Sequence, residues 1–325
     1  MNQFRVSEKL VEMIHRDFQG FHPGYRGVHA AARYYAGYFV GSPEAASLSR
    51  AIHFQGGRTP VSIRHSNSVS GNPWGPPNSI SLAAKFYLPD GTVTDLVALP
   101  LPVFFTSTPE QTLEFLTVMQ PVGDTGQPDA SKAHAFLEAN PGVARAVELA
   151  KAMPGFSSFA TTRFNALHAF RFVNAAGVAT YGRYHWAPIA GEVYERPEVS
   201  AARSPHFLFE ELEDRLRNKP VGFRLEVELA EADDTLVDPS VPWPSDRRRI
   251  VMGQLTVTRT TTNEELGDSE MMHDPTRVVD GIELSADPIL AARRGIYEVS
   301  LAHRTGGWKG RQGSLERAGC PFLGG

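Results

Sequence analysis

The sequence predicts an α+β protein in which antiparallel strands form a barrel or a sandwich with helices inserted between them. Three observations favour this class. The β-rich segments come in two groups of about four, helical patterns separate the groups, and strands and helices do not alternate regularly. A doubly wound parallel sheet needs such alternation and is disfavoured. A chain of 325 residues can form one large barrel domain or two smaller domains.

Two helical patterns open the chain. The first runs up to Gly20, and the second begins at Ser42, a capping residue followed by proline at the first helical position. Their apolar side chains recur at helical spacing and are expected to face the core. These side chains are Leu10, Val11, Ile14, Ala45, Leu48 and Ile52.

The first strand group lies within residues 58–104. Its segments are TPVSIRHS, SLAAKFYL and TVTDLVAL, separated by clusters of Asn, Pro and Gly. Short turn-rich connections between β-rich segments indicate antiparallel neighbours.

The middle of the chain is helical. Thr108-Pro109-Glu110-Gln111 is a capping box with proline at the first helical position. Residues 129–152 are rich in helix formers and are interrupted at Asn140-Pro141-Gly142, which predicts two short helices joined by a turn.

The second strand group brings the total close to eight. Its segments are HAFRFVNAAG, VATYGRYHW, GFRLEVELAE and IVMGQLTVTR, and the third alternates apolar and polar residues strictly. A final helix is predicted from the Asp287-Pro288 cap through Arg304, followed by a loose tail over residues 305–325.

Composition narrows the function classes. Thirty-two basic and 36 acidic residues give a net charge of −4, so no global field favours nucleic acid or an anionic membrane, and a small-molecule partner is expected. No apolar run approaches the roughly 18 residues of a membrane span, and the start lacks a signal-peptide pattern, so a cytoplasmic protein is expected. The single cysteine, Cys320, excludes an internal disulfide, a cysteine-based zinc site and an iron–sulfur cluster.

Three polar clusters are candidates for a site. They are Arg26-Gly-Val-His29, the strand segment Arg64-His65-Ser66-Asn67-Ser68, and the late helix with Arg293, Tyr297 and Arg304. At about 100° per residue, the three helical side chains fall within roughly 40° of one another. This stripe is either a solvated basic face or a phenolate metal ligand stabilised by a neighbouring guanidinium. Taken singly, His29, Ser66 and His168 also fit ordinary structural roles.

Taken together, the motifs resemble one family. The order Arg26-Gly-Val-His29, TPVSIRHS, AKFYLPDG, PVFF, HAFRFVNAAG and GIELSADPILAARRGIY is similar to that of the haem catalases, specifically the small catalase-related peroxidases, over residues 20–304. The resemblance implies a catalase-like eight-stranded antiparallel β-barrel with inserted and flanking helices, forming one haem domain over 1–325. The barrel core would span about 20–260 and the haem-ligand helix about 287–304.

The resemblance also implies haem b as cofactor and a role for each matching residue. His29 matches the distal histidine, and Ser66 the serine that orients it. Tyr297 matches the proximal phenolate ligand of the iron, and Arg293 the arginine that supports it. The remaining matches are the outer proximal residues His168 and Asp287, the propionate-binding Arg26, Arg64 and Arg304, and the apolar distal residues Val28 and Phe104.

The implied activity is peroxidase chemistry: reduction of hydrogen peroxide or organic hydroperoxides through a ferryl intermediate, with electrons from an unidentified small organic reductant. His29 would carry the proton between the two peroxide oxygens. Large catalases carry a distal asparagine where alignment on PVFF puts Leu99, which has no donor. We therefore expect weak catalase activity. Because the N-terminal arm is short and the C-terminal domain of large catalases has no counterpart, a homodimer is expected.

Three alternatives remain open. The first is a fatty-acid hydroperoxide isomerase or dehydratase. It is disfavoured because relatives that make allene oxides carry threonine where this chain has Val28. An apolar pocket at Leu99 would permit a peroxide-dependent oxygenase. A haem-binding protein without catalysis would keep Tyr297 but would have no need of His29 with Ser66.

Overall fold

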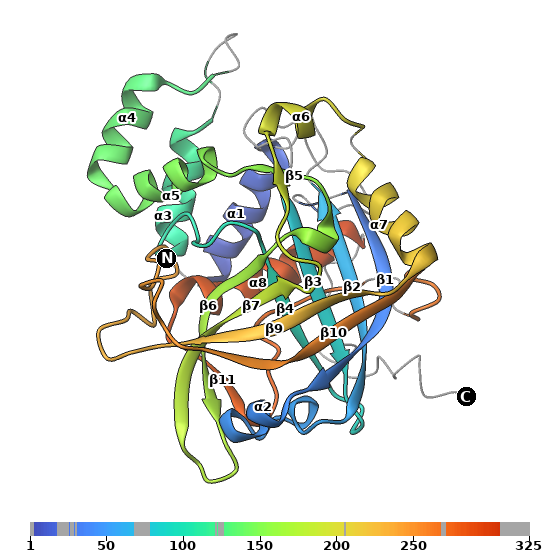
Figure 1. Ribbon diagram of the computed structural model, residues 1–325. Coiled ribbons are helices and arrows are strands. Elements are labelled where there is room, and N and C mark those ends of the chain that lie inside the picture. Colours follow the sequence, from blue (N-terminus) through green and yellow to red (C-terminus); the bar gives the residue numbers. More distant parts are fainter. Residues whose placement is uncertain are drawn as a thin grey trace.

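One curved antiparallel sheet dominates the protein (Figure 1). The structure, a computed structural model, describes residues 3–17, 26, 29, 31–67, 79–120, 122, 127–204, 206–267 and 271–305. The sheet has nine strands in the order β11-β6-β7-β9-β10-β1-β2-β3-β4. Their bounds are β1 Ala31–Gly41, β2 Arg58–Asn67, β3 Ile80–Tyr87, β4 Val93–Ala98, β6 Phe164–Val173, β7 Ala179–Pro188, β9 Val221–Leu229, β10 Arg249–Thr261 and β11 Ile282–Leu284. A separate two-stranded sheet pairs β5 (Gly155–Phe156) with β8 (Tyr194–Glu195).

The sheet curls until β4 meets β6. Leu99 and Asn165 join the two edges through backbone hydrogen bonds of 2.9 and 2.6 Å. The short strand β11 pairs with the opposite end of the same β6 edge, at Phe170–Phe172. The predicted α+β class and eight-stranded antiparallel barrel are therefore confirmed, with β11 as an additional strand.

The barrel interior is an apolar core. Alternate residues of β9, including Phe223, Leu225 and Val227, are fully buried, as their period of two predicts. Aromatic rings fill the centre, and the Phe39 ring centroid lies 5.4 Å from that of Phe86 and 6.4 Å from that of Trp186. Such close packing makes the barrel a rigid support for side chains on its other face.

The opposite face of β1–β4 carries polar residues that are also buried. Tyr34 pairs with Arg64 across β1 and β2, and Lys85 pairs with Asp95 across β3 and β4. These residues alternate with core residues, so they share the face away from the barrel interior. All eight positions of β3 are buried, so other parts of the chain must cover this polar face.

Helices lie around the sheet (Figure 1). Their bounds are α1 Gln3–Asp17, α2 Pro43–Leu48, α3 Pro109–Val118, α4 Ala130–Ala139, α5 Pro141–Lys151, α6 Pro197–Ala201, α7 Phe207–Asn218 and α8 Pro288–Arg304, with 3₁₀ turns η1 Ile52–Phe54 and η3 Phe159–Thr161. Helix α8 packs against α1 and α3. The predicted caps are present: Ser42 Oγ accepts from Ala45 N and Thr108 Oγ1 accepts from Gln111 N, both at 3.1 Å.

Three expectations about local structure were wrong or incomplete. Helix α2 ends at Leu48, and Ile52 lies in a 3₁₀ turn with 42% of its surface exposed, so it does not face the core. The aromatic run Tyr34–Phe39 forms strand β1 at the centre of the sheet, although no strand was predicted there. Helices α6 and α7 were also not predicted. Residues 306–325, with Cys320, lie outside the described residues.

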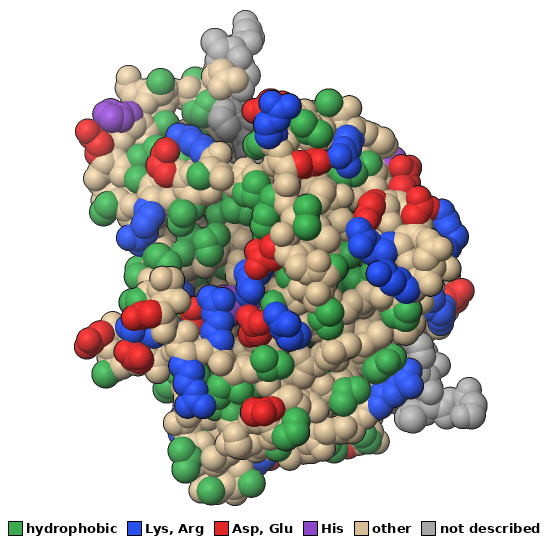
Figure 2. All heavy atoms as spheres, viewed as in Figure 1, with side chains coloured by type: hydrophobic (Ala, Val, Ile, Leu, Met, Phe, Trp, Pro, Cys, Tyr) green, Lys and Arg blue, Asp and Glu red, His purple; other side chains and the backbone are tan. Residues whose placement is uncertain are grey.

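The distribution of charged side chains on the molecular surface is mixed, as the nearly equal numbers of basic and acidic residues suggest. Basic and acidic side chains are interspersed over the face shown in Figure 2. Pairs such as Arg163 with Glu192, at 2.8 Å, account for part of this mixing. Within the part of the chain that the structure describes, no helix is long and apolar enough to cross a membrane.

Candidate functional site

Four side chains form a continuous hydrogen-bonded network between β6 and α8. Asp287 Oδ2 lies 2.6 Å from His168 Nδ1, and Arg293 Nη1 donates to His168 Nε2 at 3.1 Å. Arg293 Nη2 donates to the Tyr297 hydroxyl oxygen at 2.5 Å. The structure therefore brings together all four residues of the predicted proximal network, although His168 lies 119 residues before Asp287 and 125 residues before Arg293 in the chain.

Local features of both elements aim these side chains at one another. Asp287 is the N-cap of α8, where its Oδ1 accepts from Ile289 N and Leu290 N at 2.8 and 3.1 Å. Arg293 and Tyr297 lie one helical turn apart on α8. In β6, the register with β7 shifts between Asn165 and Ala169, and Leu167 has a φ of 59°. This bulge re-aims His168, since a bulge changes the side-chain direction that a regular strand would impose.

The network fixes the tautomer of His168. Arg293 can only donate, so Nε2 of His168 is the acceptor and Nδ1–H donates to Asp287. Burial lowers the pKa of His168, and this outweighs the opposing effect of the Asp287 carboxylate, so the ring is neutral at neutral pH. The arrangement holds the Arg293 guanidinium firmly against the Tyr297 oxygen.

Three arginines gather near the polar face of β1 and β2. Arg26 Nη2 and Arg304 Nη2 both donate to the carbonyl oxygen of Met271, at 2.5 and 3.1 Å. Arg64, only 4% exposed, donates to the carbonyl oxygen of His29 at 2.6 Å. Burial and the neighbouring charge of Arg26 lower the pKa of Arg64 to about 9. The charges of Arg26 and Arg304 act unfavourably on the buried Arg64 guanidinium, so an anionic ligand is favoured among these cations.

His29 lies next to this cluster in an uncommon backbone conformation. Its φ is 54°, in the left-handed region that few non-glycine residues adopt. Burial first, then the charges of Arg64 and Arg26, lower the pKa of His29 to about 4. The ring is therefore neutral at pH 7 and can accept a proton. Its Nδ1 is buried and has no hydrogen-bond partner among the described residues.

Ser66 does not make the contact that the resemblance implied. Its hydroxyl shares a 2.5 Å hydrogen bond with the hydroxyl of Ser81, which stands directly opposite it across β2 and β3. His29 Nδ1 has no hydrogen-bond partner among the described residues, so the role of Ser66 in orienting His29 stays a prediction.

The remaining predicted site residues are placed as follows. The ring of Phe104 lies 6.3 Å from that of His168, so its described contact is with the proximal network, and a distal role stays a prediction. Leu99 is half-buried at the barrel closure beside Asn165. Val28 lies outside the described residues.

Two buried residues near the arginines were not predicted. Lys85 is 2% exposed and His273 is 1% exposed. Lys85 was hidden in an apolar strand pattern, and His273 in a segment without regular structure. A charged or titratable residue inside an otherwise apolar run is the signal that could have drawn attention to Lys85.

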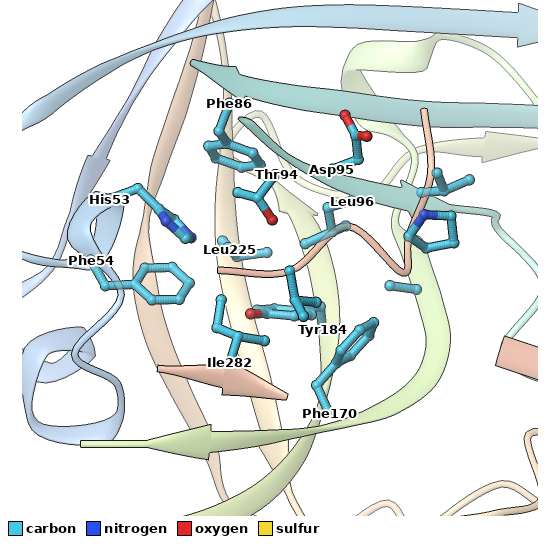
Figure 3. Close-up of a pocket in the computed structure, with 14 residues that line it drawn as sticks. His53, Phe54, Phe86, Thr94, Asp95, Leu96, Phe170, Tyr184, Leu225 and Ile282 are labelled. Atoms are coloured by element: carbon cyan, nitrogen blue, oxygen red, sulfur yellow. The ribbon is translucent and has the colours of Figure 1, made fainter. Parts of the chain in front are cut away.

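A small cavity inside the barrel is separate from this site. Its volume is about 20 Å³, enough for roughly one water molecule, and His53, Phe54 and Phe86 point into it (Figure 3). The carboxylate of Asp95, which also lines the cavity, points away from the other labelled side chains (Figure 3). The cavity is too small for an organic substrate. Among the described residues, no group of three or more His, Cys, Asp or Glu side chains could hold a metal ion.

Comparisons with known proteins agree with this geometry. A catalase-related peroxidase of Mycolicibacterium paratuberculosis is 38% identical over 299 residues, covering 90% of this chain and 93% of that protein. Another, of Synechococcus elongatus, is 33% identical over 292 residues, covering 89% and 86%. Solved structures of a bacterial and a fungal catalase share the fold, with TM-scores of 0.73 and 0.77 at 22% and 20% identity, and this chain covers 58% and 62% of their lengths. The profile of the catalase family matches residues 10–312, and the chain belongs to that family.

Proposed function

We propose that this protein is a haem-dependent peroxidase that reduces hydrogen peroxide or organic hydroperoxides with electrons from a small organic donor. The observation that carries the proposal is the 2.5 Å hydrogen bond from Arg293 to the Tyr297 oxygen, at the end of the chain of contacts from Asp287 through His168. A guanidinium at that distance stabilises the phenolate form of tyrosine, which is the form that ligates ferric iron.

The residues present fit a haem. Arg26, Arg64 and Arg304 form a cationic cluster, and Arg64 Nε is buried without a partner among the described residues. Haem b carries two carboxylates, which guanidinium groups bind through charge-assisted hydrogen bonds. Tyr297 would hold the iron, with Arg293 supporting it. The match of both donor sets to one cofactor is the reason to prefer haem b over a smaller ligand.

His29 would act as the proton carrier. Its low pKa keeps it neutral at pH 7, so a ring nitrogen can take the proton from one peroxide oxygen and return it to the other. The oxygen that receives the proton leaves as water from hydrogen peroxide or as alcohol from a hydroperoxide. When bound, the haem supplies the two electrons that this cleavage consumes, and the organic donor restores them.

The side chain of Leu99 is the reason to expect only weak dismutation of hydrogen peroxide. Leucine offers no hydrogen-bond donor where the resemblance to large catalases implies an asparagine. A missing donor of this kind costs about a hundredfold in rate. Leu99→Asn should raise oxygen release from hydrogen peroxide while leaving turnover of an organic reductant similar, and Leu96→Val, in the packed barrel wall, serves as a control for altered packing.

The ferric absorption spectrum of the purified holoprotein tests the proposal. Wild-type protein should show a high-spin ferric spectrum with tyrosinate ligation. Tyr297→Phe should abolish that spectrum, whereas Tyr38→Phe, on β1, should retain it. A wild-type protein that cannot be reconstituted with haem, or a Tyr297→Phe variant with an unchanged spectrum, would refute the assignment.

A second experiment separates an enzyme from a haem-binding protein. His29→Ala should abolish the reaction with peroxide while haem is retained. Unchanged peroxide reactivity would favour the binding protein. A single domain over 1–325, a cytoplasmic location and a homodimer remain predictions, which limited proteolysis, cell fractionation and sedimentation analysis can check.

A further inference from the structure

His273 is a buried histidine that neither the network nor the arginine cluster uses. It is 1% exposed, and both of its ring nitrogens are buried without a hydrogen-bond partner among the described residues. A neutral imidazole has one N–H donor and one acceptor nitrogen. A buried N–H without an acceptor is costly, so the native protein is expected to satisfy it.

The backbone on both sides of His273 is fixed. Two residues earlier, the carbonyl oxygen of Met271 accepts from Arg26 and Arg304. One residue later, Asp274 N donates to Asp95 Oδ2 at 2.9 Å. These contacts hold the main chain at His273 between the arginine cluster and Asp95 of β4, and the side chain is buried there.

The charges that most strongly lower the pKa of His273 are positive. Burial first, and then the charges of Lys85, Arg26, Arg64 and Arg277, lower its pKa well below the usual value, so the ring is neutral. Lysine and arginine side chains only donate hydrogen bonds. None of these cations can accept the His273 N–H. The carboxylate that this segment contacts is that of Asp95, and its Oδ1 is itself buried without a partner among the described residues, so it does not accept this N–H either.

We propose that His273 donates a hydrogen bond to a carboxylate of the bound haem, alongside the arginines that flank Met271. The inference rests on the proposed function, because it takes haem as the ligand. A carboxylate accepts several hydrogen bonds at once, and it is favoured by the surrounding cations. His273 is thus a positioning residue that fixes the carboxylate end of the cofactor.

His53 supplies a matched control. It is 3% exposed and its Nδ1 also has no partner among the described residues, but it lies in the barrel interior, with its ring centroid 4.1 Å from that of Phe54. The cavity beside it fits about one water molecule. Replacing His53 therefore tests the loss of a buried imidazole without touching the arginine cluster.

The experiment measures haem transfer from holoprotein to excess apomyoglobin for wild type, His273→Phe, His273→Gln and His53→Phe. His273→Phe should lose haem about tenfold faster, which is ~1.4 kcal/mol, the size of one hydrogen bond to a charged group. His273→Gln retains an N–H donor and should restore most of the retention, and His53→Phe should match wild type. Resonance Raman spectra should show a shifted propionate bending mode in His273→Phe and a mode close to the wild-type position in His273→Gln.

The outcomes distinguish this proposal from the proposed function. A wild-type dissociation rate and an unchanged propionate mode in His273→Phe would overturn the role of His273 alone. If His273→Phe does not fold, His273→Leu replaces it as the variant without a donor, and wild-type values in His273→Leu overturn the role as well. A wild-type protein that holds no haem would overturn both proposals.

Discussion

Asp287 uses both carboxylate oxygens as acceptors, and this makes Asp287→Asn a sharp test of the network. Oδ1 caps α8 through Ile289 N and Leu290 N, and Oδ2 binds His168 Nδ1. Asparagine has one acceptor oxygen. If that oxygen keeps the cap, its NH₂ group faces His168, whose proton must then move to Nε2 and oppose the Arg293 donor. If the oxygen turns to His168, the cap is lost.

Either orientation removes at least one of the buried hydrogen bonds that Asp287 makes, and these are hydrogen bonds to a charged carboxylate. Asp287→Asn should therefore lower the free energy of unfolding by about 1.5–3 kcal/mol. The matched control is Asp129→Asn, because Asp129 caps α4 through Ser131 N and Lys132 N at 3.0 and 3.2 Å. Asparagine caps as well as aspartate, so that control should change stability by less than about 0.5 kcal/mol.

Urea unfolding of the holoproteins, followed by far-ultraviolet circular dichroism, gives both free energies. The ferric absorption spectrum of Asp287→Asn should also shift, because Arg293 is no longer held on Tyr297. If Asp287→Asn costs no more than Asp129→Asn and leaves the spectrum unchanged, the network does not support Tyr297 and the reasoning is wrong.

Three further predictions follow from the structure. His29→Gln should slow the reaction with peroxide by about 10²- to 10⁴-fold in stopped-flow measurements while haem is retained, and a change below tenfold would exclude His29 as the proton carrier. Burial lowers the pKa of His53 to about 3, so the stability that its neutral ring contributes is present above pH 6.5 and is lost as pH falls toward 3. The free energy of unfolding should therefore fall by about 2 kcal/mol less in His53→Phe than in wild type when the pH is lowered from 7 to 5. Urea unfolding at both pH values measures this difference, and an equal fall in the two proteins would contradict the prediction. A Cβ on Gly182 would lie 2.4 Å from Val227 Cγ1 and 2.8 Å from Glu228 O, whereas one on Gly57 would meet no atom within 4 Å. Gly182→Ala should cost about 1–3 kcal/mol in the same unfolding assay and Gly57→Ala much less, and equal costs would rule out the steric explanation.

Local sequence signals predicted the elements that local chemistry decides. Capping residues and proline located the starts of α2, α3 and α8, because a cap is an interaction within one turn of chain. Period-two alternation located β9, because burial of one face is imposed on every second residue. The aromatic run of β1 has no such alternation, since this strand is central and packs against other parts of the chain on both faces.

The candidate site shows the same division. The sequence alone determined that Arg293 and Tyr297 share one face of a helix, and its motif order identified the family and the residues to examine. Only the tertiary structure decided that His168 reaches both Asp287 and Arg293, that Ser66 binds Ser81 instead of His29, and that His273 lies buried among cations. These contacts join residues far apart in the chain, through a bulge, a strand register and a loop held at both ends. Their geometry depends on how the barrel closes, and no local sequence pattern encodes which distant residues that closure brings together.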